Sequence, residues 1–568
     1  MQKRLVECVP NFSEGRDKSI IDAITAAITA AGDVELLDVD PGQATNRTVV
    51  TFVGEPEAVV EAAYRGIRRA AELIDMSRHH GAHPRMGATD VCPLIPVSGV
   101  TLEECAELAA QLAQRVADEL DIPVYLYEAA ARKPGRKNLA VCRRGEYEAL
   151  PERMGTDDGP DLGNRPFDAA VARTGATTIG ARDFLIAVNF NLNTTSTRRA
   201  NAIAFDVREK GRPKRQGNKV TDKPVVDDSG RTVMIPGTLP GTKAIGWYIP
   251  EYGIAQVSMN ITDIARTPLH VAFDEVCRAA AERGVRVTGT EIVGLVPKRT
   301  LVEAGRYFLH KQQRSTGLPE SEIIDMAVRS MGLAELKPFD PAEKVIEYMI
   351  EARRGQSEER LVDMTCRAFA DRTASEAPAP GGGSIAAYMG ALAAALGTMV
   401  ANLSAHKPGW DDRWREFSDA ADRGRALQDR LIALVDEDTA AFNSFMAALA
   451  MPKGTEAERA ERHKAMQQAT LLAARIPLMT MHAALDTMPL LREMAAKGNP
   501  ASASDAGVGA LAARAAVHGA ALNVRINAAS LDDKELARTL TDEAAELCAE
   551  ADKAEAEIIE TVNNHINI

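Results

Sequence analysis

LVECVPNFSEGRDKSIIDAITAAITAAGDVELLDVD, residues 5–40, sets the architecture of the N-terminal half. A short β-rich run opens it, the apolar spacing of residues 18–31 predicts an amphipathic helix, and a second β-rich run ends at Asp40. The same alternation continues through RTVVTFVG (47–54) into a helix expected over residues 57–74. Strands that alternate with amphipathic helices are typical of an α/β region.

A second cycle of strands and helices begins at FLIAVNFNLN, residues 184–193. It continues through a helix expected near residues 197–208, two further β-rich runs and a helix over residues 268–284. Because hydrophobic cores stop growing near ~250 to 300 residues, a chain of this length must divide. We therefore predict two mixed-sheet α+β subdomains in the N-terminal half, at residues 1–183 and 184–349.

The last part of the chain has a different pattern. Residues 350–358 are polar and predict a linker, and residues 359–568 have helical spacing and a high Ala content, which predicts an all-α helical bundle. The uncharged stretch SIAAYMGALAAALGTMVANL (384–403) is long enough to span a membrane, but it is built mostly from small residues. We expect a helix packed inside the bundle, and the chain is a multidomain α/β and all-α protein.

Composition narrows the class of partner. The net charge of −13 excludes a general nucleic-acid binder, because neutralising phosphates needs a surplus of Lys and Arg. The seven cysteines are scattered without a CxxC pair, which indicates buried thiols in a reducing compartment. The N-terminus carries no apolar core of a signal peptide. We expect a cytoplasmic protein that binds neither nucleic acid nor membrane.

The segment IDMSRHHGAHPRMGATDVCPLIPV, residues 74–97, predicts a loop rich in titratable groups. It carries His79, His80 and His83 between a helix and an apolar strand, and loops on a rigid scaffold are common sites of function. Proton transfer by an imidazole is one interpretation, because its pKa lies near neutrality. A polar structural loop is a second. A metal site is a third, although the HHxxH spacing lacks the helical arrangement of zinc proteases.

Two features of the C-terminal part point to chemistry. APAPGGGSIAAYMG places Gly382, Gly383 and Ser384 at the start of a long helix, where free N–H groups hold an anion or where glycines allow tight packing. Asp438 interrupts an apolar helical stripe formed by Leu431, Val435, Phe442, Phe445 and Leu449. A carboxylate there is either paired or has a raised pKa suited to proton transfer, whereas we expect Asp436 and Glu437 to be solvated.

Several of these motifs resemble a known family. LVECVPNFSEGR, LLDVD (36–40), TNRTV (45–49), IDMSRHHGAHPRMG and RTGATTIGARDFLIAVNFNL (173–192) are similar to glutamate formimidoyltransferase and cover nearly the whole first half. APGGGS and VDED (435–438) are similar to formimidoyltetrahydrofolate cyclodeaminase. The chain thus resembles the bifunctional formimidoyltransferase-cyclodeaminases.

The resemblance implies an activity and its substrates. Such an enzyme transfers the formimidoyl group of N-formimidoyl-L-glutamate to N5 of tetrahydrofolate, and then closes 5-formimidoyltetrahydrofolate to 5,10-methenyltetrahydrofolate with loss of ammonia. The folate is an acceptor substrate that can carry a polyglutamate tail, and no metal is needed. The family also implies a homo-oligomer.

The resemblance also assigns residues. It implies that His83 is the base of the first reaction and Asp438 the catalytic aspartate of the second. It implies folate contact along RTGATTIGAR, for which we name Thr174, Gly175, Thr177 and Gly180, and in the glycine-rich element at Gly382, Gly383 and Ser384.

For three side chains, alternative roles remain open. Asp40 either orients the imidazole or binds the pterin, or it is a satisfied residue at a strand end. Arg47 and Arg85 match the carboxylates of glutamate, or they form internal salt bridges. Lys453 and Asp505 match family positions less closely.

Alternatives for the whole chain also remain. The helical part could be a methenyltetrahydrofolate cyclohydrolase or an inactive assembly domain, the His loop could be a metal amidohydrolase site, and the donor could carry formyl rather than formimidoyl. Residues 209–242 lack periodicity and predict a long surface loop. Its basic start could tether an acidic polyglutamate tail; these residues are Lys210, Arg212, Lys214, Arg215 and Lys219.

Overall fold

The computed structural model describes residues 4–43, 45–81, 84–217, 222–354 and 360–566. Its contacts divide the chain into two compact units. The first comprises Met1–Thr300 with Met331–Arg353, and the second comprises Leu301–Ser330 with Arg354–Ile568. The α/β region and the all-helical region predicted from the sequence are both confirmed.

The first unit opens with a mixed sheet. Its strand order is β1-β4-β2-β5-β7-β6, with β3 paired to β4. Strands β5, β7 and β6 run parallel to one another, and the other pairs are antiparallel. The strands are β1 (Leu5–Cys8), β2 (Asn11–Phe12), β3 (Val34–Gly42), β4 (Arg47–Gly54), β5 (Thr89–Ser98), β6 (Val124–Glu128) and β7 (Thr177–Ala181).

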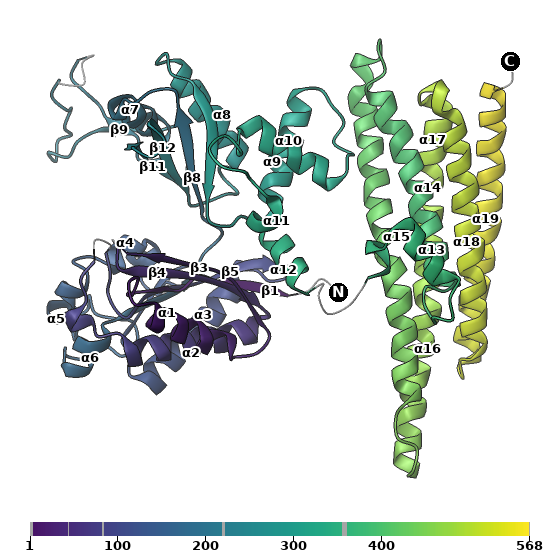
Figure 1. Ribbon diagram of the computed structural model, residues 1–568, viewed down its shortest axis with the longest axis horizontal. Helices are drawn as coiled ribbons and strands as arrows, with labels where there is room; N and C mark the ends of the chain where they lie inside the picture. The colour runs from purple at the N-terminus through teal and green to yellow at the C-terminus, as the bar shows by residue number, and fades with distance from the viewer. Residues whose placement is uncertain (1–3, 44, 82–83, 218–221, 355–359, 567–568) are drawn as a thin grey trace. The chain divides into compact units, whose positions relative to one another are not determined.

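The three long helices of this subdomain cover one face of the sheet (Figure 1). They are α1 (Lys18–Thr29), α2 (Pro56–Leu73) and α3 (Leu102–Leu120). Asp17 caps α1, and Thr101 with Glu104 forms a capping box at α3, so the helix starts are specified locally. Their apolar stripes bury Ile24, Ile28 and Leu112 against the strands. The opposite face of the sheet is left for a cavity.

Short helices connect these strands. They are η1 (Met76–Arg78), η2 (Pro134–Lys137), α4 (Leu139–Cys142), η3 (Tyr147–Ala149), α5 (Leu150–Arg153) and α6 (Ala169–Thr174). The guanidinium groups of Arg136 and Arg153 each lie 4.9 Å from the centroid of the Tyr125 ring. This stacking fixes the connections beside β6.

The second sheet is antiparallel throughout and has the order β11-β12-β8-β13. Its strands are β8 (Ile186–Leu192), β11 (Thr242–Ile249), β12 (Ile254–Ile261) and β13 (Val287–Val293), and the helices packed on it are α7 (Thr197–Val207) and α8 (Leu269–Ala281). Helices α11 (Pro341–Lys344) and α12 (Ile346–Arg354) complete the first unit. The second strand-and-helix cycle is therefore confirmed.

Residues 209–242 are more regular than we predicted. Strand β9 (Arg212–Pro213) pairs with β10 (Met234–Ile235), and bridges join Arg215 to Pro224 and Val226 to Thr232. The segment is thus a narrow β-ribbon with few side chains to pack, which is why no apolar alternation marks it. Lys219 lies outside the described residues.

The second unit is a helical bundle. Its helices are α9 (Lys298–Lys311), α10 (Glu320–Met331), η4 (Leu361–Asp363), α13 (Cys366–Thr373), α14 (Gly382–Ala405), η5 (Asp411–Arg413), α15 (Trp414–Leu449), α16 (Glu456–Leu485), α17 (Met488–Lys497), η6 (Pro500–Ser502), α18 (Ala503–Ala529) and α19 (Lys534–Ile566). Small residues let the helices approach closely. A Cβ on Gly390 would lie 2.9 Å from Leu431, and one on Gly509 would lie 2.5 Å from Leu491.

Helix α14 contains the uncharged stretch noted in the sequence. It is the one helix among the described residues whose length and hydropathy would allow it to cross a membrane, and 61% of its most apolar window is buried. Its buried side comprises Ala386, Ala387, Ala391, Ala394 and Ala401, which pack in the bundle core. This burial matches the predicted packed helix.

The turn between α9 and α10 docks onto the bundle. Ser315 donates to Asn402 at 2.6 Å, and Thr316 donates through its hydroxyl to Asp422 at 2.6 Å. The Thr316 backbone N–H donates to Ser418 at 3.0 Å. These contacts explain why residues 301–330 belong to the second compact unit although we predicted them within the subdomain at 184–349.

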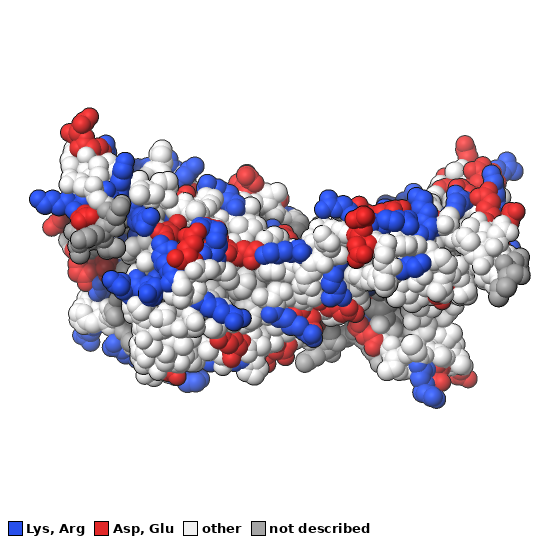
Figure 2. Space-filling view, turned by 90° about the horizontal axis from the view of Figure 1, so that it is seen from above, with Lys and Arg blue, Asp and Glu red and all other residues white. Residues whose placement is uncertain are grey.

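One face of the molecule carries charges of both signs. Lys and Arg alternate with Asp and Glu across the face seen in Figure 2.

Candidate active sites

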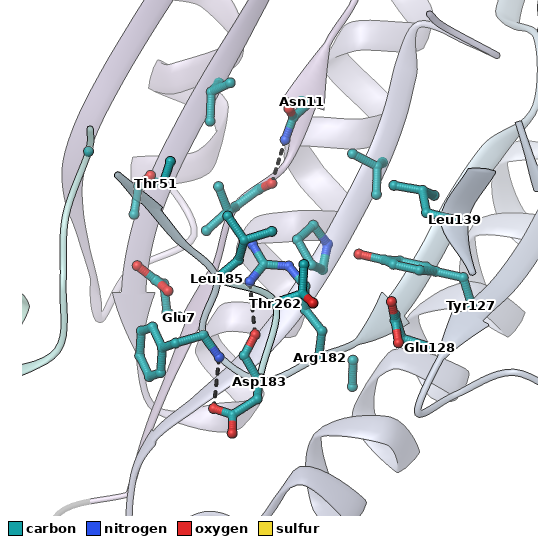
Figure 3. Close-up of a pocket in the computed structure, with 18 of the residues that line it drawn as sticks. Glu7, Asn11, Thr51, Tyr127, Glu128, Leu139, Arg182, Asp183, Leu185 and Thr262 are labelled. Atoms are coloured by element: carbon teal, nitrogen blue, oxygen red, sulfur yellow. Dashed lines mark hydrogen bonds between the residues drawn. The ribbon is translucent and has the colours of Figure 1, made fainter. Parts of the chain in front are cut away.

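A cavity of about 990 Å³ lies on the uncovered face of the first sheet. Strand alternation directs side chains of β1, β4, β5 and β6 into it, including Glu7, Thr51 and Tyr127 (Figure 3). The second sheet and its loops contribute Lys243 and Thr262. The cavity therefore has a floor from one subdomain and polar groups from both.

One end of the cavity is basic. Arg47 and Arg143 line it, and both lie against the buried carboxylate of Asp90. Arg143 donates from Nε to Asp90 at 3.2 Å, and Arg47 Nη1 lies 3.7 Å from the same carboxylate. Burial lowers the pKa of the Arg47 guanidinium to about 10. Because two guanidinium groups face one carboxylate, the cluster has a net positive charge, which can bind an anionic ligand.

Asp90 also connects this end to the histidine loop. Its Oδ1 accepts a hydrogen bond from the backbone N–H of Met86 at 3.1 Å. The sequence singled out neither Asp90 nor Arg143, because their pairing joins residues 53 positions apart. A buried Asp within an apolar strand was the only signal, and it did not reveal the partner.

Two residues predicted from the sequence line the cavity, namely Asp40 and Arg47. Arg47 also donates a hydrogen bond to Asn11. Pro84, which follows His83 in the chain, lines the same cavity. His83 itself lies outside the described residues, so its predicted role stays a prediction.

Arg85 is buried and engaged within the protein. It donates twice to Glu148, each time at 2.7 Å, and lies 3.4 Å from Glu146. Hydrogen bonding to Glu148 raises the pKa of Arg85 further. Its geometry matches the internal salt bridge, and it does not line the cavity.

The other histidines of the loop have separate surroundings. His79 is buried, its Nε2 lies 2.9 Å from the carbonyl of Asn46, and burial lowers its pKa. His80 is exposed, and its carbonyl accepts from the Asn46 side chain. Among the residues that the structure describes, which exclude His83, no three His, Cys, Asp or Glu side chains form a group able to hold a metal ion.

The RTGATTIGAR segment, for which we predicted no element of its own, forms the end of α6 and all of β7. Thr177 is buried in β7, and Thr174 hydrogen-bonds the carbonyls of Ala170 and Gly175. Cβ atoms on Gly175 and Gly180 would lie 2.2 Å from Met86 O and 2.3 Å from Tyr127 O, so close backbone packing requires both glycines.

The four residues just described do not line the cavity. Ala181 and Arg182, at the end of the same segment, do. The predicted folate contacts at Thr174, Gly175, Thr177 and Gly180 thus remain untested, and the segment reaches the cavity only at its C-terminal end.

Glu7 is a cavity residue that sequence reasoning missed. It is 4% exposed, and burial raises its pKa to about 7, an effect that Arg182 opposes and Glu347 reinforces. Position 7 belongs to the LVECV run, in which a charged residue between apolar neighbours was the available signal.

The second site is built where α15 meets the start of α14. Ser384 donates from Oγ to Asp438 at 2.9 Å, and a Cβ on Gly383 would lie 2.1 Å from the Asp438 carboxylate. Burial raises the pKa of Asp438, while hydrogen bonds from the side chain and backbone of Ser384 lower it. The structure therefore brings Gly383, Ser384 and Asp438 together, with Gly382 beside Asn523 of α18.

Other expectations for α15 need correction. Phe442 and Leu449 are 37% and 41% exposed, because the α15–α16 hairpin extends past the ends of α18 and α19 (Figure 1). Asp436, which we expected in solvent, accepts a hydrogen bond from the Leu361 N–H at 3.0 Å, and burial raises its pKa. Glu437 pairs with Arg430.

Lys453 and Asp505, which match the family less closely, lie in different elements of the bundle. Lys453 is exposed in the turn before α16, and Asp505 is in the first turn of α18. Neither contacts Asp438 through a hydrogen bond or ion pair in the described chain.

An α/β unit with an open-faced sheet and a helical bundle with a half-buried carboxylate define a two-site protein of small-molecule chemistry. The formiminotransferase domain models match residues 5–182 and 187–351, and the formiminotransferase-cyclodeaminase model matches residues 365–546. The chain belongs to the formimidoyltransferase-cyclodeaminase family.

Individual relatives agree with this assignment. The formimidoyltransferase-cyclodeaminase of Gallus gallus is 42% identical over 98% of both chains. A glutamate formimidoyltransferase of Thermoplasma acidophilum is 40% identical and covers 56% of this chain and 96% of its own. A methenyltetrahydrofolate cyclohydrolase of Methylorubrum extorquens is 37% identical over 36% of this chain and 98% of its own.

Proposed function

We propose that this chain carries out two consecutive folate reactions. It transfers the formimidoyl group of N-formimidoyl-L-glutamate to N5 of tetrahydrofolate, and then converts 5-formimidoyltetrahydrofolate to 5,10-methenyltetrahydrofolate with release of ammonia. One observation carries the proposal: the chain spans the length of a bifunctional relative and holds one polar site in each compact unit.

In the first reaction, N5 of the folate attacks the amidine carbon of the donor. The N5 proton leaves, the bond from that carbon to the glutamate nitrogen breaks, and this nitrogen gains a proton to become the free amine. His83 is the proposed carrier of the proton, since an imidazole both accepts and donates near neutral pH. Arg47 and Arg143 supply the positive charge that a glutamate carboxylate needs.

In the second reaction, N10 attacks the carbon of the protonated formimidoyl group. Asp438 takes the N10 proton and gives it to the departing nitrogen, which leaves as ammonia while the N5–C–N10 bridge keeps the positive charge. A carboxylate with a raised pKa suits both transfers. Ser384 holds the carboxylate in place.

The experiment follows both products. Purified protein with tetrahydrofolate and N-formimidoyl-L-glutamate should release glutamate and ammonia and form the near-ultraviolet chromophore of 5,10-methenyltetrahydrofolate. Glutamate release without ammonia would reject cyclisation and favour an assembly role for the bundle. Supplying N-formyl-L-glutamate as the alternative donor tests which group is transferred.

A cyclohydrolase is the second candidate for the helical bundle, because the Methylorubrum extorquens relative bears that name. The discriminating measurement is decay of added 5,10-methenyltetrahydrofolate. Decay that is much faster than the buffer control, together with no ammonia from 5-formimidoyltetrahydrofolate, would favour hydrolysis.

We also propose a homo-oligomer. Apolar side chains of α14 and α18 are exposed in the single chain, namely Leu392, Met399, Leu403, Val508, Leu511, Leu522 and Ile526. Surfaces of this kind are commonly covered by a partner. Light scattering on the purified protein should give a mass that is a multiple of 61.0 kDa.

Two finer proposals concern the ligand and the location. The basic start of the β-ribbon would hold an acidic polyglutamate tail, so Lys210→Glu with Lys214→Glu should raise KM for long-tailed folates more than for tetrahydrofolate. The free cysteines suit a reducing cytoplasm, which cell fractionation would check.

A further inference from the structure

Glu7 lies on the cavity floor in β1, where it pairs with Val53 of β4 and Ile95 of β5. Its residue surface is 4% exposed, yet its side chain opens on the cavity (Figure 3). Within the described ranges no side chain or backbone group donates a hydrogen bond to its carboxylate, and no ion pair involves it. Arg182 instead donates to the carbonyl of Asp183 at 2.9 Å.

A buried carboxylate without donors is unfavourable, and buried polar groups in folded proteins are nearly always hydrogen-bonded. The donors for Glu7 must therefore come from what occupies the cavity. A group that offers two parallel N–H donors would match a carboxylate best.

Apart from Thr51, the strand floor between Glu7 and the basic end is apolar. Val9 and Pro93 line the cavity between Glu7 and the basic end, and Val49 and Val91 line it level with Asn11. Asn11, at that basic end, is four residues further along the chain, which corresponds to about 13 Å at the rise of an extended strand. An apolar surface of this length can pack against a flat two-ring system.

We propose that Glu7 binds the pterin ring of the folate, through hydrogen bonds from the ring N3–H and 2-amino group to the two carboxylate oxygens. This inference rests on the proposed function for the choice of ligand. The ring then lies over Val9 and Pro93, and its N5 faces the end of the cavity at which Asp90 anchors the histidine loop.

The amidine of N-formimidoyl-L-glutamate also carries paired N–H donors. It is the weaker match, because the reacting amidine carbon must lie beside the histidine loop. That loop is tied to Asp90, which pairs with Arg47 at the opposite end of the cavity floor.

The test is direct binding to the full chain without a donor. Glu7→Gln should weaken the affinity for 5-formyltetrahydrofolate at least tenfold at pH 8, measured by calorimetry. Affinity for p-aminobenzoyl-glutamate, which lacks the pterin, should stay within twofold, as should KM for N-formimidoyl-L-glutamate. Glu35→Gln, on β3 and away from the cavity lining, is the matched control and should change nothing.

Three results would overturn the inference. They are an unchanged Kd for 5-formyltetrahydrofolate in Glu7→Gln, an equal loss for p-aminobenzoyl-glutamate, and a raised KM for the amidine donor with an unchanged folate Kd. If Glu7→Gln fails to fold, the pH dependence of the wild-type Kd for 5-formyltetrahydrofolate replaces the variant as the test. This Kd should rise as pH falls from 8 to 5.5, given that Arg182 and Glu347 are the charged neighbours of Glu7, and a flat profile would overturn the inference.

This readout separates the inference from the proposed function. A protein that binds 5-formyltetrahydrofolate through Glu7 but releases no glutamate from N-formimidoyl-L-glutamate would reject the proposed transfer and keep the pterin site.

Discussion

Asp438 is the residue on which the second reaction depends most directly. Asp438→Asn keeps its shape but removes the proton acceptor, so cyclisation should fall by a factor of about 10² to 10⁴. Glutamate release in the first reaction should be unchanged. Because burial raises the pKa of Asp438, the wild-type cyclisation rate should decline as pH falls through that raised value, since the ionised form accepts the proton. Stopped-flow absorbance with 5-formimidoyltetrahydrofolate measures both effects.

Gly383 offers a sharper steric test of the same site. A methyl group there would lie 2.1 Å from the Asp438 carboxylate, whereas one on Gly381 would meet nothing closer than 4.0 Å. Gly383→Ala should therefore abolish most cyclisation, and Gly381→Ala should retain it. Equal activity of the two variants would contradict the proposed placement of the carboxylate.

Glu7 should lower the free energy of unfolding of the unliganded protein. Its folded pKa of about 7 lies above the solvated value of 4.5, so the unfolded chain releases the proton first as pH rises. Wild-type stability therefore falls between about pH 4.5 and pH 7, by about 3 kcal/mol in total. Urea unfolding should find Glu7→Gln more stable than wild type at pH 8, with a difference that shrinks towards pH 5. A constant difference across this range would contradict the raised pKa.

Individual site residues differed in how far the sequence revealed them. Helical periodicity was enough to single out Asp438, because its neighbours on the helix lie within a few turns. Glu7, Asp90 and Arg143 acquire their surroundings from other strands and loops, so no local pattern marks them. Arg85 lies in the HPRMG motif, which suggested that it binds a substrate carboxylate, but its guanidinium group donates to Glu148.

At the scale of elements, the turn between α9 and α10 is held by polar contacts. Thr316→Val removes the hydroxyl that donates to Asp422 at 2.6 Å in a buried position, and hydrogen bonds to charged groups contribute about 1.5 to 3 kcal/mol. The helical unit should lose about 2 kcal/mol in urea unfolding. Thr373→Val is the control, because its exposed hydroxyl bonds only within α13. Similar losses in both variants would mean that the turn is not anchored there.

Elements were predicted best where their own residues specify them. Apolar spacing alone predicted α1, α2, α7 and α8 to within a few positions. Strand β7 was missed because it is buried between parallel neighbours β5 and β6, which come from distant parts of the chain. Its high content of Gly and Thr gives no local indication of a strand.

At the scale of the whole molecule, the two reactions should be separable by mutation. His83→Ala should abolish transfer and spare cyclisation of added 5-formimidoyltetrahydrofolate, which is the reverse of Asp438→Asn. Mixing the two variants should restore methenyltetrahydrofolate formation from the original substrates after a lag, observed by absorbance. A single variant that removes both steps while remaining folded would reject two independent sites.

The division of the chain into α/β and all-helical parts followed from a change in periodicity, which any window of residues shows. The bounds of the two compact units could not be predicted from the sequence, because the contacts of Ser315 and Thr316 with α14 and α15 join residues about a hundred positions apart. Contact at such separation depends on tertiary packing and leaves no local trace.

Docking of residues 301–330 onto the bundle has a practical consequence for dissecting this protein. A fragment that begins after residue 349 would lack helices α9 and α10. It would expose the polar side chains of α14 and α15 that these helices cover, among them Asn402 and Ser418. Inactivating point mutations leave this contact intact, so they are the cleaner way to obtain a single-activity version.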